Sequence, residues 1–167
     1  KTFFGFALQF LWQKYPRIEF HREIEQLFKL DIQADEFVDK NFIILGTKYS
    51  YPISLEGMLK LQEVSNSWSV ALPFCEIKHG PLSLVDDKTV CIGHVTNECI
   101  MDNVNQIRAR NGRVIEVGVG KEINIPDIGP YSSLLFLIYL QLFSYKLALV
   151  KGLNPNKPRS IAKTITV

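Results

Sequence analysis

Glu56, Lys60 and Glu63 are three charged residues whose spacing places them on one stripe of a helix. At 100° per residue their side chains fall within an arc of about 60°. Two carboxylates beside an ammonium could move a proton next to a carbonyl, because one carboxylate acts as the base and the cation stabilises a developing enolate. The alternative is an exposed ion pair at i, i+4, which is common and contributes about 0.3 to 0.5 kcal/mol.

The remainder of this helix favours the catalytic interpretation. Apolar residues occupy most of its remaining circumference, namely Leu55, Met58, Leu59, Leu61 and Val64. A helix that is apolar nearly all round is largely buried and has little surface to give to solvent. We therefore expect its charged stripe to line a cavity.

Two further residues could take part in proton transfer or covalent chemistry. His79 stands just before a Gly-Pro turn, where a loop can present a functional side chain, and imidazole titrates near neutrality. Its alternative is a histidine that bonds only to the local backbone. Lys163 lies in the C-terminal tail, where a lysine is usually solvated. If the tail covers a pocket, burial lowers the pKa of this amine and makes it a Schiff-base nucleophile.

Two weaker features are also present. Residues 46–50, between an expected strand and an expected helix, could hold a phosphate with backbone N–H groups, although this loop has a single glycine. His21 and His94 have no comparable setting, and we interpret both as structural.

The elements that must position these residues alternate between strands and helices. Short apolar runs predict strands at residues 42–45, 70–72, 90–93, 114–117 and 123–125. Helices are predicted at residues 18–38 with breaks, from the N-cap Ser54 to about 68, at 97–110 with a stop at 111–112, and at 131–151. This alternation implies βαβ units and a parallel sheet covered on both faces.

Composition indicates one folded domain with a small partner. The chain has 167 residues, of which 47% are hydrophobic and 22% charged. Its net charge of +2 gives no argument for a nucleic-acid or membrane partner. Cys75, Cys91 and Cys99 form no C-x-x-C pair, so we expect reduced thiols, no metal site and a cytoplasmic protein.

Two apolar segments could be mistaken for membrane or secretory sequences. Residues 134–150 are interrupted by Gln141, Ser144 and Lys146, which favours a buried helix over a membrane span. Residues 3–12 are apolar, but no small-residue cleavage site follows them. Because the chain begins at Lys1 without a methionine, we expect further polypeptide upstream.

Several separated motifs occur in a recognisable order, at residues 45–46, 51–57, 59–65, 76–82, 108–112 and 158–167. Together they resemble the second sugar-isomerase (SIS) domain of the glucosamine-6-phosphate synthase family, also named glutamine fructose-6-phosphate aminotransferase (isomerizing). The resemblance runs from about residue 42 to the C-terminus, with a looser match before it. It implies an α/β fold, a three-layer αβα sandwich with a parallel, flavodoxin-like sheet.

The resemblance also implies a reaction, in which ammonia from glutamine joins fructose 6-phosphate and the product is isomerised to glucosamine 6-phosphate. Carried over by motif, Glu63 would move a proton between C1 and C2 of the sugar. Lys60 would assist at the same carbons, and Glu56 would be the second carboxylate of the site. The family reaction uses no cofactor in this domain.

Three more residues receive roles by the same resemblance. His79 would open the sugar ring and, in the family, reaches the site of a neighbouring subunit, which predicts a homodimer. Lys163 would form the Schiff base with the open ketose. Ala162 would contact the sugar through its backbone.

The implied organisation makes residues 1–167 a second SIS domain, with a helical segment at 1–40 and a tail at 153–167 that closes the site. The family's glutaminase domain and first SIS domain are not in this chain. Thr47-Lys48 replaces the family's Arg-Gly, and residues 152–156 replace an acidic turn. Only the second departure resembles relatives without a glutaminase domain. Two alternatives therefore stay open: an amino-sugar-phosphate deaminase or isomerase, and a non-catalytic sugar-phosphate-binding module.

Overall fold

Five parallel strands form one sheet in a computed structural model that describes residues 20–96 and 100–158. Their order across the sheet is β2-β1-β3-β4-β5. The strands are β1 (Asn41–Gly46), β2 (Ser69–Pro73), β3 (Thr89–His94), β4 (Arg113–Gly118) and β5 (Ile123–Asn124). Each coincides with one of the predicted apolar runs, and β1, β3 and β4 are buried on both faces, as parallel strands between helical layers must be.

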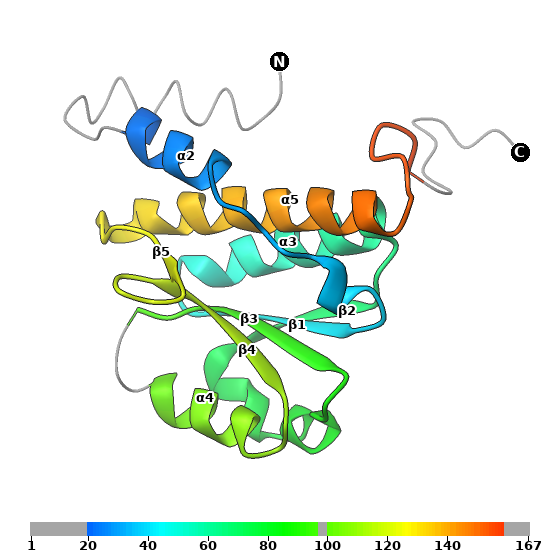
Figure 1. Ribbon diagram of the computed structural model, residues 1–167. Helices are drawn as coiled ribbons and strands as arrows, with labels where there is room; N and C mark the ends of the chain where they lie inside the picture. Colours follow the sequence, from blue (N-terminus) through cyan, green and yellow to red (C-terminus); the bar gives the residue numbers. More distant parts are fainter. Residues whose placement is uncertain (1–19, 97–99, 159–167) are drawn as a thin grey trace, which may run out of the picture.

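Helices cover both faces of the sheet, which confirms the α/β sandwich (Figure 1). One face carries α2 (Phe20–Phe28), α3 (Ser50–Ser65) and α5 (Ser132–Val150). The other face carries α4 (Met101–Arg108) and the short helices η2 (Phe74–Lys78) and η3 (Pro81–Leu84). Two further 3-10 turns are η1 (Asp35–Phe37) and η5 (Gly129–Tyr131). Each layer has its own apolar core against the sheet.

The turn from β1 into α3 brings the two elements into close contact. A Cβ added at Gly46 would lie 2.5 Å from the carbonyl oxygen of Ser50 and 2.5 Å from Ser54 Oγ. Ser54 is not the N-cap predicted from the sequence: the helix begins at Ser50, and the Ser54 hydroxyl donates to the Ser50 carbonyl at 3.0 Å. A serine can bond back to residue i−4 inside a helix, so its presence alone does not mark a helix start.

The buried side of α3 consists mainly of small residues, namely Ser50, Ser54, Gly57, Leu61 and Ser65. Leu55 and Leu59, predicted to be buried, are 38% and 40% exposed. The prediction was wrong because bulky side chains of α5 and the sheet already fill the interior, which leaves α3 room for small groups only. Its outer face therefore combines apolar and charged residues.

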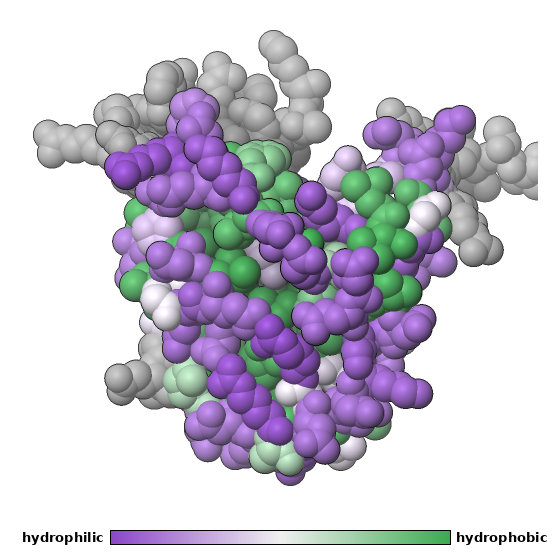
Figure 2. Space-filling view, in the orientation of Figure 1, coloured by the Kyte–Doolittle hydropathy of each residue, from purple (hydrophilic) through white to green (hydrophobic). Residues whose placement is uncertain are grey.

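α5 is the predicted long apolar helix, and Gly152 follows it with a φ of 70°. Residues 129–150 are long and apolar enough to cross a membrane by length and composition alone. Most of this helix is buried against the sheet and α3, as expected of a core helix. In the view of Figure 2, hydrophilic residues cover most of the visible surface, with hydrophobic residues between them.

Two predicted helices are shorter than the sequence suggested. The stretch at residues 18–38 contains α2 and η1, separated by a non-helical segment. In the stretch at 97–110, α4 spans Met101–Arg108, while residues 97–99 lie outside the described part of the chain. The predicted stop is confirmed, because Asn111 takes the left-handed conformation with a φ of 63°.

Candidate active site

Lys60 lies between two carboxylates on the outer surface of α3. Its Nζ donates a hydrogen bond to Glu63 Oε2 at 2.7 Å and lies 3.4 Å from Glu56 Oε1. The side chains are 27%, 43% and 37% exposed for Lys60, Glu56 and Glu63. The helical spacing therefore brings the three predicted charges together.

The two carboxylates keep Lys60 protonated. Partial burial alone would lower the pKa of Lys60, but the hydrogen bond to Glu63 and the charges of Glu56 and Glu63 outweigh burial and raise it above its ordinary value. At neutral pH this group is a fixed ammonium. It can hold a negative charge on a ligand, and it offers no free amine for nucleophilic attack.

In the described part of the chain, the stripe is absent from the lining of both cavities found there. The expectation that it lines a cavity stays a prediction, because residues 159–167 lie outside the described residues. The stripe lies beside the exposed side chains of Leu55 and Leu59. An exposed face that combines apolar residues with a charged cluster is suited to covering by another polypeptide. Such covering would create the cavity that α3 alone does not form.

His79 lies on the other side of the sheet from the stripe. It follows η2, whose Phe74 and Ile77 are buried in the core next to α4. The His79 side chain is exposed, and its backbone N–H donates to the Glu76 carbonyl at 3.0 Å. The structure therefore does not bring His79 and the stripe of α3 together within one chain.

Lys163 and Ala162 lie outside the described residues, so their predicted places near the site stay predictions. The described part of the tail reaches residue 158. Its beginning is attached to the core, because Lys151 Nζ donates to Ser67 Oγ at 2.8 Å and so joins the ends of α5 and α3.

The loop at residues 46–50 does not support a phosphate site. The Thr47 N–H donates to Ser50 Oγ at 2.8 Å, and the Ser50 N–H donates to the Thr47 carbonyl at 2.8 Å. The Tyr51 N–H donates to the Lys48 carbonyl at 3.4 Å. These donors stabilise the start of α3 and are not directed at a ligand.

His94, interpreted from sequence as structural, occupies an unusual position. It ends β3, is 4% exposed and stacks on Phe136 with ring centroids 5.4 Å apart. Its Nδ1 has no hydrogen-bond partner among the residues that the structure describes. Burial lowers the pKa of His94 to about 4, although the charge of Asp127 acts in the opposite direction. The sequence signal that could have singled out His94 is its place at the carboxyl end of a buried strand, where α/β proteins bind ligands.

Other reactive side chains form no further cluster in the described ranges 20–96 and 100–158. Cys75 is an exposed thiol, and burial raises the pKa of Cys91 to about 12, so this thiol is inert. His21 lies 3.4 Å from Glu25 on the exposed side of α2. Within those ranges, no group of three His, Cys, Asp or Glu residues could hold a metal ion.

The sequence matches a family model described as the SIS domain over residues 37–119. It is 40% identical over 148 residues to a glutamine–fructose-6-phosphate aminotransferase [isomerizing] of Buchnera aphidicola, covering 80% of this chain and 24% of that protein. The enzyme of the same name from Bacteroides thetaiotaomicron is 37% identical over 76% of this chain. The chain thus spans about a quarter of the length of these relatives.

Solved structures agree with these matches. The C-terminal domain of glucosamine-fructose-6-phosphate aminotransferase from Francisella tularensis has a TM-score of 0.67 and 32% identity, covering 80% of this chain and 43% of that one. A glucosamine-6-phosphate deaminase from Thermotoga maritima has a TM-score of 0.72 and 28% identity, covering 87% and 45%. The sequence matches, the strand order and the paired charges of α3 lead to one conclusion: this chain belongs to the SIS-domain family and is homologous to the C-terminal domain of glutamine–fructose-6-phosphate aminotransferase.

Proposed function

We propose that this chain is the C-terminal isomerase part of an enzyme that converts fructose 6-phosphate and ammonia from glutamine to glucosamine 6-phosphate. The observation that carries this proposal is the ammonium of Lys60 between Glu63 and Glu56 on an exposed helix face. Homology to aminotransferases of this name supports it. We also propose a cytoplasmic location.

The exposed stripe supports a proton-transfer role. After ammonia has formed a protonated imine at C2 of the sugar, Glu63 takes a proton from C1. The electron pair of that C–H bond forms a C1–C2 double bond, while the π pair of the C2–N double bond moves to nitrogen and gives an enolamine. Return of the proton to C2, with loss of the C1 hydroxyl proton as the C1–O double bond forms, gives the amino aldose with no net oxidation or reduction. Lys60 stabilises the negative charge that develops near C1 and C2, and Glu56 keeps Lys60 charged.

The position of His79 supports a role in a neighbouring subunit. Within one chain the sheet separates the layer of η2 from that of α3, so His79 cannot serve the stripe of its own chain without a large rearrangement. A homodimer related by a two-fold axis could place His79 of each chain at the site of the other. We propose that His79 opens the sugar ring there.

We further propose that Lys163 forms the Schiff base with the open ketose and that the backbone of Ala162 contacts the sugar. Lys60 is a poor candidate for the Schiff base, because its two carboxylates raise its pKa. Pro155 and Pro158 stiffen the approach of the tail. The whole tail would then close the site.

The test is an assay of the full-length protein with fructose 6-phosphate and either glutamine or ammonium chloride. Formation of glucosamine 6-phosphate with both nitrogen sources supports the complete synthase. Formation with ammonium only, or release of ammonia from glucosamine 6-phosphate, identifies the deaminase or isomerase alternative. Binding of both sugar phosphates without turnover would contradict catalysis and favour the regulatory module. Analytical ultracentrifugation at assay concentration tests the dimer.

Structural similarity favours a deaminase as the second candidate function. The Thermotoga maritima deaminase covers 87% of this chain with a TM-score of 0.72. Both activities require the proton transfer assigned to Glu63. The stripe therefore does not distinguish them, whereas the assay does.

A further inference from the structure

A second chemically distinctive region lies at the carboxyl ends of β3, β4 and β5. A cavity of about 230 Å³ opens there, and its lining includes His94, Thr96, Lys121 and Asp127. None of the residues proposed for proton transfer lines it. Ligands of open parallel sheets bind outside the carboxyl ends of the strands, so this cavity is in a favourable place for a binding site.

His94 supplies the observation that points to a ligand. It lines the cavity, is 4% exposed, and leaves a ring nitrogen without a partner among the described residues. A buried polar group without a hydrogen bond costs about 1 to 3 kcal/mol, and native proteins rarely leave one without a reason. Stacking on Phe136 holds the ring in place. The imidazole is neutral at physiological pH, since burial lowers its pKa to about 4.

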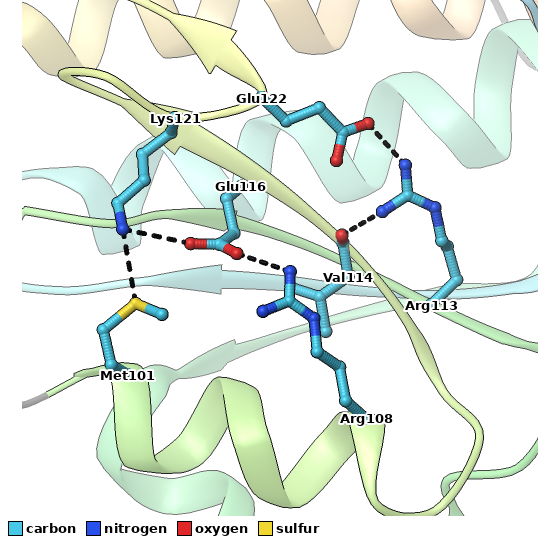
Figure 3. A network of polar contacts seen from close by, with 7 residues as sticks. All are labelled: Met101, Arg108, Arg113, Val114, Glu116, Lys121 and Glu122. Atoms are coloured by element: carbon cyan, nitrogen blue, oxygen red, sulfur yellow. Dashed lines mark hydrogen bonds and ion pairs between the residues drawn. The ribbon is translucent and has the colours of Figure 1, made fainter.

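The charges around the cavity balance and do not select an anion. Lys121 is the nearest cation of the lining, but its Nζ lies 3.2 Å from Glu116 Oε2, and Glu116 is also paired with Arg108 at 2.5 Å (Figure 3). Lys121 also points at Met101, with its Nζ 3.4 Å from the sulfur (Figure 3). Lys121, Glu116 and Arg108 together carry one net positive charge, and the ammonium of Lys121 is directed at Glu116 and not at the cavity. Asp127 adds a negative charge on the lining itself.

Asp127 is held in position by its own turn. Its Oδ1 accepts a hydrogen bond from the Gly129 N–H at 2.9 Å. A carboxylate has capacity for further donors, so a ligand N–H can bind beside this contact. The side chain of Ser132 is committed elsewhere: it accepts from the Ile128 N–H at 2.8 Å and donates to the Pro126 carbonyl at 3.0 Å.

The rest of the lining is apolar and includes Val95, Val119 and Ile125. Apolar walls suit the faces of a flat ring, whereas His94, Thr96 and Asp127 suit polar groups on its edge. The volume is below the range usual for drug-sized ligands, which limits the occupant to one or two rings.

We propose that this cavity binds an uncharged nitrogen heterocycle of the nucleobase class, with N–H donors directed at Asp127 and an edge nitrogen or N–H paired with His94. The site is separate from the proton-transfer stripe. It gives the chain a ligand other than its sugar-phosphate substrate.

Saturation-transfer NMR and isothermal titration calorimetry on the full-length protein test this proposal. The probes are cytosine and adenine, with glucose and inorganic phosphate as comparison ligands. We expect binding of at least one base and none of phosphate or glucose at this cavity. His94→Phe, which keeps the stack on Phe136, and Asp127→Asn should each weaken base binding by about tenfold.

Matched controls separate this site from the rest of the protein. Asp87→Asn changes an exposed carboxylate that precedes the amino end of β3, whereas the cavity lies at the carboxyl end, so it should leave base binding unchanged. Glu63→Gln should also leave it unchanged, so failure of the proposed catalysis does not affect this test. If His94→Phe does not fold, Asp127→Asn decides, because Asp127 is exposed. Absence of base binding, binding indifferent to the cavity variants, or a phosphate preference lost in those variants would overturn the proposal.

Discussion

Gly57 of α3 lies directly against Leu140 of α5, so that a Cβ added at Gly57 would stand 2.4 Å from Leu140 Cδ1. Glycine at this position allows the helices to approach closely, and this contact sets the position of α3, which carries the charged stripe. Gly57→Ala should destabilise the fold by about 1 kcal/mol, because overpacking costs about 1 to 3 kcal/mol and better helix propensity returns up to about 1. Urea titration measures this change.

A double-mutant cycle identifies the contact responsible. Leu140→Ala creates space beside Gly57 but leaves a cavity in the core, since Leu140 is fully buried. In the Leu140→Ala background, Gly57→Ala should become neutral or stabilising. Equal effects of Gly57→Ala in both backgrounds would mean that the two residues are not coupled.

Glu63→Gln should lower the isomerisation rate of the full-length enzyme by about 10² to 10⁴ with little change in sugar-phosphate binding, because glutamine keeps the shape and removes the base. Steady-state kinetics measures the rate. Glu25→Gln is the matched control, since Glu25 also faces a partner at i, i−4 on an exposed helix. Near-normal isomerisation by Glu63→Gln would show that the stripe is only a surface ion pair.

Lys60→Met should separate stability from activity. The pair with Glu63 and Glu56 is partly exposed, so its loss should change the free energy of unfolding by less than about 1 kcal/mol. Activity should fall strongly, because two carboxylates would then face the substrate without a cation. Lys60→Arg restores the charge and should recover part of the rate. A variant that loses stability and activity in parallel would contradict the catalytic role.

The stability of the fold should depend on pH through His94. Its pKa is lowered from 6.5 to about 4 in the folded state, so the unfolded chain binds the proton more readily. This contribution is complete above about pH 6.5 and is lost as the pH falls towards 4; it amounts to at most about 3 kcal/mol. The unfolding free energy of the wild type minus that of His94→Phe should therefore decrease as the pH is lowered from 7.5 to 4.5. A constant difference would rule out this linkage.

Borohydride reduction in the presence of fructose 6-phosphate should trap an adduct on Lys163 of the full-length protein. Reduction fixes only an imine, so the modified residue is the one that attacks the sugar. Lys163→Arg keeps a cation but cannot form the imine and should abolish trapping. Peptide mass spectrometry locates the adduct. Its appearance on Lys60 instead would remove Lys163 from the mechanism.

The strands were predictable from sequence because each is a short apolar run between polar or glycine-containing turns. β1, β3 and β4 are buried on both faces, so their sequences are mainly apolar and do not alternate between apolar and polar residues. The start of α3 was not predictable from capping, since Ser54 has the residue type of an N-cap, whereas the helix begins at Ser50 after Tyr49 with no side-chain cap hydrogen bond.

The candidate site was partly predictable. Helical spacing alone places Lys60 between Glu56 and Glu63. The exposure of Leu55 and Leu59 was not predictable, because it depends on the bulk of α5 packed against the opposite side of α3. The setting of His94 depends likewise on Phe136, a residue distant in sequence, and no local pattern encodes that stack.

The sheet that separates His79 from the stripe of α3 has a consequence for how the activity would originate. One chain contains both apolar layers of the sandwich but holds only part of the proposed reaction centre. Folding and the acquisition of activity are then separate events with different concentration dependence. Dilution should therefore abolish activity while the circular dichroism spectrum stays unchanged. Mixing two inactive variants, one changed at His79 and one changed in the stripe, should restore activity.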